Sequence, residues 1–146
     1  MKIVFHEQFA QVWTDDVTPY VFTLITKIPP SSALAVTFFQ SQLDLAQSIH
    51  KKFKEAYLIS DFSETTEETR ELLCHYYMEF IPKLVKNKIS YISFVCPHSS
   101  FELLPKEKKK MLSQAPLGVF PTFVEALAAV NLKRSMELAQ RFEEAY

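Results

Sequence analysis

The stretch Ala56-Tyr57-Leu58-Ile59-Ser60, followed by Asp61-Phe62-Ser63-Glu64, decides the fold of this chain. Its first five residues are mostly apolar with little alternation, which is typical of a strand buried on both faces of a sheet. Directly after the loop, Thr65-Thr66-Glu67-Glu68 has the spacing of a capping box, with Thr65 as the N-cap. A buried strand that leads through a short loop into a helix predicts one unit of a largely parallel sheet.

The same alternation of strand and helix extends in both directions from this stretch. Before it, apolar residues spaced as one helix face predict a helix that begins after Ser31 and ends at about Glu55. The stretches 2–6, 10–14 and 20–25 predict an opening of two or three short strands, followed by strands at 56–60 and 89–96 and a short edge strand at 119–120. Further helices are expected after Thr65, at 105–113 and from Thr122 onward. The order predicts an α/β fold with a mixed, mostly parallel sheet of four to five strands and about four helices.

Length and composition narrow the classes of protein to consider. A chain of 146 residues with 48% hydrophobic and 23% charged residues is one folded domain, 1–146. The formal net charge of -1 argues against a nucleic-acid partner. The only glycine, Gly118, rules out the glycine-rich loops that cradle phosphates. We expect no cofactor.

The cysteines and the N-terminus indicate the compartment. Cys74 and Cys96 are too few for a disulfide framework and lack the spacing of a metal or redox motif. No apolar run approaches the ~20 residues of a membrane span, and the N-terminal residues turn polar too early for a secretory signal. We therefore expect a cytoplasmic protein with no membrane span.

Several segments together resemble the SpoIIAA-like branch of the STAS domain family, whose members share the shape of anti-sigma-factor antagonists. The resemblance is carried by the order and spacing of four segments rather than by any one motif. They are Ile28-Pro29-Pro30-Ser31-Ser32, Leu58-Ile59-Ser60-Asp61-Phe62-Ser63, Ile81-Pro82, and Val119-Phe120-Pro121-Thr122-Phe123-Val124-Glu125-Ala126-Leu127.

The resemblance implies a non-enzymatic α/β module that works by binding. Anti-sigma-factor antagonists carry a phosphorylatable serine in an Asp-Ser-Ser-Gly-Leu motif at a helix start. This chain departs from that pattern, because the corresponding stretch reads Glu67-Glu68-Thr69-Arg70-Glu71-Leu72-Leu73 and contains neither glycine nor serine.

Polar residues follow the two central strands of the predicted sheet. Ligands of open α/β sheets bind outside the carboxyl ends of the strands. A ligand- or partner-binding site is therefore one hypothesis for these residues, and backbone turns and caps are the other. The residues concerned are Asp61, Ser63, Thr65, His98 and Ser99.

Catalysis and metal binding are weaker interpretations of the same residues. A hydrolase built from Ser99, His98 and Asp61 would lack the G-x-S-x-G turn that exposes such a nucleophile. The four histidines are scattered, so we expect no metal site and no enzyme.

A dense basic run lies in the helix expected at 105–113. It offers a positive surface for an acidic partner, phosphate head groups or RNA, or simply a solvated helix face. The run consists of Lys106, Lys108, Lys109 and Lys110.

The chain holds 13 phenylalanines and 6 tyrosines, more than a core of this size requires. Exposed aromatic side chains would form a dimer face or an apolar ligand groove. The leading hypothesis is a STAS-like regulatory module that contacts a protein partner or a second copy of itself as a homodimer. The alternative is a carrier of a small apolar or lipid-like ligand in an aromatic-lined groove.

Overall fold

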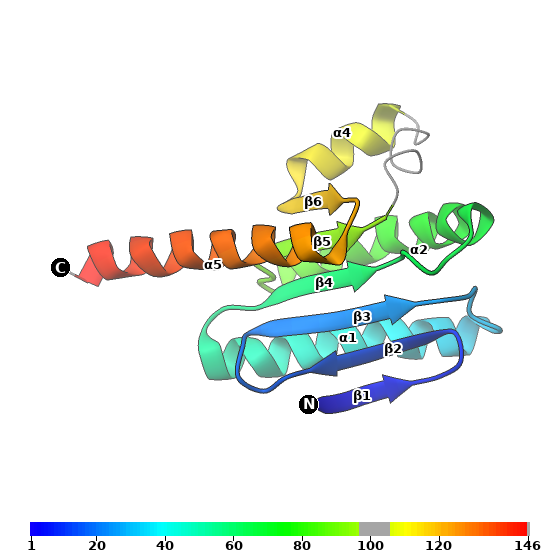
Figure 1. Cartoon of the computed structure of the whole chain (residues 1–146), viewed down its shortest axis with the longest axis horizontal. Coiled ribbons are helices and arrows are strands. Elements are labelled where there is room, and N and C mark those ends of the chain that lie inside the picture. The colour runs from blue at the N-terminus through cyan, green and yellow to red at the C-terminus, as the bar shows by residue number, and fades with distance from the viewer. Residues whose placement is uncertain (97–105, 146) are drawn as a thin grey trace.

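The computed structural model describes residues 1–96 and 106–145 and shows one six-stranded sheet. The strands lie side by side in the order of the chain (Figure 1). They are β1 (Lys2–His6), β2 (Ala10–Thr14), β3 (Tyr20–Ile25), β4 (Tyr57–Asp61), β5 (Tyr91–Val95) and β6 (Leu117–Phe120).

The sheet is mixed, as the sequence predicts. The β1–β2 and β2–β3 pairs are antiparallel, and the pairs from β3 to β6 are parallel. The expected number of four to five strands is wrong, because residues 2–25 form a full three-stranded meander and Leu117–Phe120 adds a sixth strand at the far edge.

Helices alternate with the parallel strands. They are α1 (Ser32–Phe53), α2 (Glu67–Lys86), α4 (Lys106–Gln114) and α5 (Phe123–Ala145). The Oγ of Ser31 accepts a hydrogen bond from the backbone N–H of Leu34 at 3.2 Å, as an N-cap should. α2 continues through Pro82 as one helix.

The expected N-cap of α2 is wrong by one residue. Thr66, rather than Thr65, caps the helix, and its Oγ1 accepts from the N–H of Thr69 at 3.3 Å. The Thr65 hydroxyl instead donates to the carbonyl oxygen of Phe62 at 2.6 Å, so Thr65 closes the loop before the helix.

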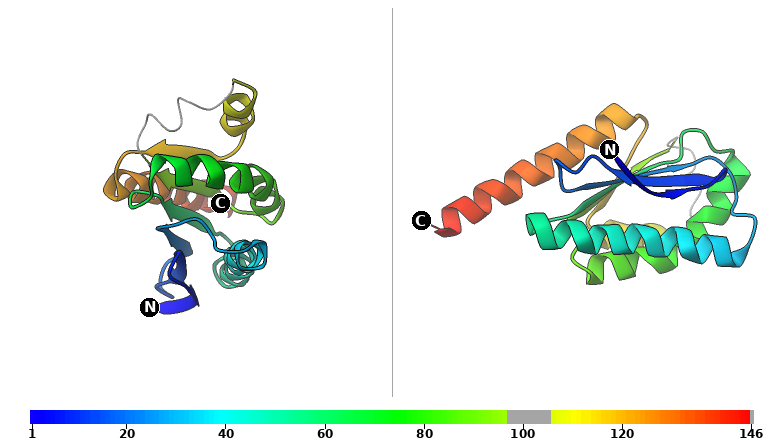
Figure 2. Two further views of the ribbon diagram at one scale, coloured as in Figure 1. Left: turned by 90° about the vertical axis from the view of Figure 1, so that its right-hand side faces the viewer. Right: turned by 90° about the horizontal axis from the view of Figure 1, so that it is seen from below.

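Two faces of the sheet are covered to different extents. α1 and α2 lie on one face, and α5 lies on the other (Figure 2). The larger core lies between the sheet and α1 and α2, where the rings of Phe5, Phe9 and Phe38 meet with centroids 5.5–5.8 Å apart. That core forms because β2 and β3 turn alternate side chains toward these helices.

α5 covers only half of its face. It packs on β4, β5 and β6 through the buried Ala126 and Val130, and then continues past the end of the sheet (Figure 1). The Ser93 hydroxyl donates to the carbonyl oxygen of Ala126 at 2.9 Å and fixes the helix over β5. Within the described residues, strands β1 and β2 therefore have a helix behind them and no helix packed on their other face, whereas β3 meets the edge of α5 through Tyr20 and Phe22.

We expect Phe38→Ala to lower the free energy of unfolding by about 3–5 kcal/mol, because it removes a fully buried ring from the center of the larger core. Urea denaturation measures the change as a lower midpoint with an unchanged slope. Val36→Ala on the same helix is the control, since Val36 is exposed and should change stability by less than about 0.5 kcal/mol. Equal effects of the two substitutions would contradict the packing described here.

Candidate binding surface

The uncovered half of the sheet presents four large apolar side chains, which we call the open sheet face. Ile3 lies opposite Trp13 in register, and the Trp13 ring stacks on Phe22 with centroids 5.7 Å apart. Leu24 shares the side of Phe22, because residues two apart on a strand point to the same face. The open sheet face therefore consists of Ile3, Trp13, Phe22 and Leu24.

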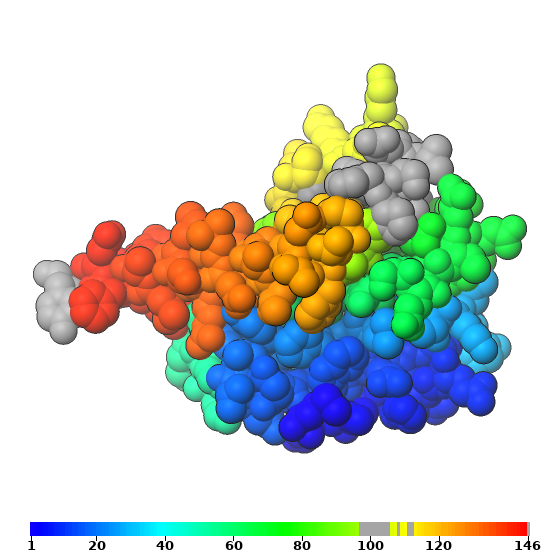
Figure 3. Space-filling model, viewed as in Figure 1, coloured from blue at the N-terminus to red at the C-terminus, as the bar shows by residue number. Residues whose placement is uncertain are grey.

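The first turn of α5 continues this apolar surface. The ring of Phe123 lies 6.3 Å from that of Phe22, and Val124 follows it at the edge of the helix. Ile3 is 48% exposed and Val124 is 75% exposed. In the space-filling view the strands remain visible below α5, which stands in front of them as a ridge (Figure 3). An exposed apolar surface of this kind is typical of an interaction site.

A buried carboxylate determines where α5 lies. The side chain of Glu55, between α1 and β4, is only 2% exposed. Its Oε1 accepts from Nε of Arg134 at 2.8 Å, and its Oε2 accepts from the Arg141 guanidinium. Because both arginines belong to α5, one charge holds the second half of that helix against the end of the sheet.

Two buried tyrosines reinforce the same contact. The hydroxyl of Tyr57 donates to Oε2 of Glu137 at 2.9 Å, and the hydroxyl of Tyr20 donates to Oδ1 of Asn131. Burial, and then the hydrogen bond to Glu137, raises the pKa of Tyr57 well above its usual value. Burial likewise raises the pKa of Tyr20. Both phenols stay protonated and act as donors to α5.

The polar residues after β4 form hydrogen bonds within their own loop and so stabilise it. Oδ1 of Asp61 accepts from the N–H of Ser63 at 2.8 Å, and the Arg70 guanidinium donates to the carbonyl oxygen of Thr65 at 2.7 Å. Asp61 is also in register with Leu24, so it lies beside the open sheet face. His98 and Ser99 lie outside the described residues.

The basic run lies apart from the open sheet face. The basic run belongs to α4, which lies next to β6 at the far edge of the sheet (Figure 1). It consists of Lys106, Lys108, Lys109 and Lys110. Lys106 and Lys110 are exposed, and Lys109 is half-buried. The structure therefore places this basic run and the loop after β4 on different parts of the fold.

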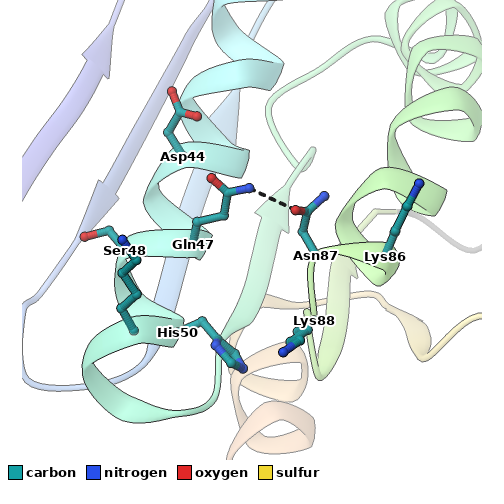
Figure 4. Close-up of a pocket in the computed structure, with 8 residues that line it drawn as sticks. Asp44, Gln47, Ser48, His50, Lys86, Asn87 and Lys88 are labelled. Carbon is teal, nitrogen blue, oxygen red and sulfur yellow. Dashed lines mark hydrogen bonds between the residues drawn. The ribbon is translucent and has the colours of Figure 1, made fainter.

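A polar pocket of about 590 Å³ opens between the ends of α1 and α2 (Figure 4). Nε2 of Gln47 donates to Oδ1 of Asn87 at 2.9 Å and joins the two helices across it. Lys51, Lys86 and Lys88 line the pocket. Lysines at helix C-termini stabilise the unpaired carbonyl groups there, which accounts for their presence without a ligand.

Residues 1–96 and 106–145 contain no group of three histidine, cysteine or carboxylate side chains placed to hold a metal ion. None of their helices is both long and apolar enough to cross a membrane. No protein-family model, curated protein or solved structure matches the chain.

Sequence reasoning missed the open sheet face as a specific site. The excess of aromatic residues pointed to an exposed apolar surface without locating it. The signal for this surface in the sequence was that large apolar side chains occur at both odd and even positions of Ala10–Thr14 and Tyr20–Ile25, and therefore on both faces of these strands. The helices α1 and α2 cover one of these faces.

We expect Arg134→Gln combined with Arg141→Gln to lower the free energy of unfolding by about 3–5 kcal/mol, because the buried Glu55 carboxylate then has no cationic partner. Chemical denaturation measures the loss. Lys133→Gln removes an exposed cation from the same helix and should cost less than about 1 kcal/mol. A double variant as stable as this control would show that the Glu55 contact does not hold α5.

We expect Cys96 to react slowly with iodoacetamide. Burial raises the pKa of its thiol to about 11, against a smaller lowering by Arg70. The reactive thiolate is therefore about 0.1% of the population at pH 8 and grows roughly tenfold per pH unit up to pH 11. The rate is measured by mass spectrometry in a Cys74→Ser variant. A rate that levels off near pH 8.5, the pKa of a free cysteine, would contradict this environment.

Proposed function

We propose that this protein is a non-enzymatic, STAS-like binding module of the cytoplasm that acts through protein–protein contact. Its contact surface is the open sheet face. The observation that carries the proposal is the stacked pair Trp13 and Phe22, which lies beside α5 where no helix of the described residues covers the front of β2. Aromatic side chains are enriched at the cores of protein interfaces, because they bury a large area at low entropic cost.

The shape of the surface favours a protein over a small ligand. Sites for small apolar molecules enclose most of the ligand surface in a cavity. The open sheet face is a shelf beside α5, with Ile3 nearly half exposed at its outer edge. A shelf leaves much of a small molecule in water, whereas a protein surface can extend across it. Carriage of an apolar ligand under α5 is the second candidate, favoured by the contact of Phe123 with Phe22.

The STAS-like part of the proposal rests on the order of elements. A mixed sheet whose strands follow one another in chain order, with β4 leading through Asp61-Phe62-Ser63 into α2, supports it. In addition, hydrogen bonds within the loop after β4 occupy the Asp61 carboxylate and the Thr65 hydroxyl, which supports a structural role for this loop rather than a catalytic one.

The test compares Ile3→Lys with Val36→Lys during gentle purification from the cells that make the protein, followed by native mass spectrometry. Lysine is well tolerated on an exposed edge strand, so Ile3→Lys should fold. Val36 is similarly exposed but lies on α1, on the other side of the sheet.

We expect an added protein mass with the wild type and with Val36→Lys, and its loss by at least about tenfold with Ile3→Lys. A stoichiometric small-molecule mass that only Ile3→Lys loses would replace the proposal with the carrier. Retention of every partner by Ile3→Lys, or no added mass at all, would contradict a contact at the open sheet face.

A further inference from the structure

We propose that the open sheet face receives the outer side of α5 from a second copy of this chain, in a two-fold symmetric dimer. This inference rests on the proposed function, since it names the partner of the same surface. It is carried by two observations, namely a second apolar surface on α5 and the fit in size between a helix and the shelf.

The second surface is an apolar stripe along the solvent side of α5. Its residues recur every three or four positions, so they share one side of the helix. Ala126 and Val130, which face the sheet, lie on the opposite side. Leu132 is 61% exposed and Met136 is 57% exposed. The α5 stripe consists of Val124, Ala128, Leu132, Met136 and Ala139, all of them exposed.

The shelf has the width of one helix. Three strands spaced at about 4.8 Å place the axes of β1 and β3 about 10 Å apart, which is close to the diameter of a helix with its side chains. α5 already occupies the neighbouring half of this face (Figure 1). A second helix of the same size would complete the layer beside it.

A single two-fold rotation can bring the α5 stripe of each copy onto the open sheet face of the other. A two-fold axis parallel to α5, placed between two facing copies, sets each α5 beside the other, over the partner's open sheet face. Rotation about this axis keeps positions along α5, and Phe123 lies against Phe22, so Val124 and Ala128 at the start of the stripe then lie over Trp13 and Phe22 of the other copy. Two sheets enclose a layer of two helices. Such an interface is self-complementary, as a closed dimer requires.

The exposed apolar side chains supply more than half of the area that a stable dimer uses. At roughly 150–220 Å² for a whole large side chain, Ile3, Phe123, Val124, Leu132 and Met136 alone expose about 500 Å² per copy. The partly buried Trp13, Phe22 and Leu24 add to it. A standard interface uses ~800 Å² per partner, polar rim included.

Three carboxylates lie next to the two surfaces. Glu125 and Glu143 share the side of the α5 stripe, because they are seven residues from Leu132 and Met136, and both are exposed. Asp61 lies beside the open sheet face. A contact between the two surfaces must therefore leave these carboxylates in water or pair them, since burying an unpaired ion is costly.

Sedimentation velocity from about 1 to about 100 µM tests the inference, because interfaces of standard size associate in the micromolar range or more tightly. The double variant Val124→Lys/Ala128→Lys changes exposed side chains at the start of the α5 stripe, so its fold should be preserved. Gln140→Lys/Glu144→Gln adds the same charge to α5 away from the stripe and is the matched control.

We expect the wild type and the control to dimerise, and the stripe variant to bind itself at least about 100-fold more weakly, since two interface residues are lost. Mixing the stripe variant with Ile3→Lys should form a heterodimer, in which one of the two contacts is intact. A wild type that stays monomeric throughout, or a stripe variant that dimerises as well as the control, would overturn the inference. A different protein retained by the open sheet face would still support the proposed function in that case.

Discussion

Within residues 1–96 and 106–145, one face of the six-stranded sheet carries a single helix, and the other features of this structure depend on that constraint. Parallel strands need crossover helices, and α1 and α2 cover the back of the sheet in that role. The antiparallel meander of β1 to β3 needs no crossover, so it brings no helix to the front. Among the helices of residues 1–96 and 106–145, only α5 reaches that side, and it covers β4 to β6 and the edge of β3.

The buried Glu55 carboxylate determines which half is covered. Its two arginine partners lie seven residues apart on α5, so both sit on the sheet side of the helix. The same side carries Glu137, which accepts from the Tyr57 hydroxyl. A helix held at these points cannot move across to β1 and β2 without leaving a buried charge unpaired, which is costly. The open sheet face therefore follows from the position of α5.

Much of the fold could be predicted from the sequence, because its signals are local. The apolar run at Tyr57–Asp61 and the serine cap of α1 indicate their elements within a few residues. The N-cap of α2 was wrong by one position, because Thr65 and Thr66 are chemically alike and only the loop geometry distinguishes them. The open sheet face could not be predicted, since Trp13 and Phe22 are apolar in the same way as core residues. Whether a helix covers them depends on the contact of Glu55 with Arg134 and Arg141, which follow it in the sequence by 79 and 86 positions.

Acrylamide quenching of Trp13 fluorescence in dilute solution tests the central claim most directly, because Trp13 is the only tryptophan of the chain. An open sheet face predicts that the indole of the single chain is readily quenched by this small solute. Quenching should weaken when the surface is covered by a partner. An indole that stays protected from acrylamide at the lowest concentrations would contradict the account, since it would place another part of the chain over β1 to β3.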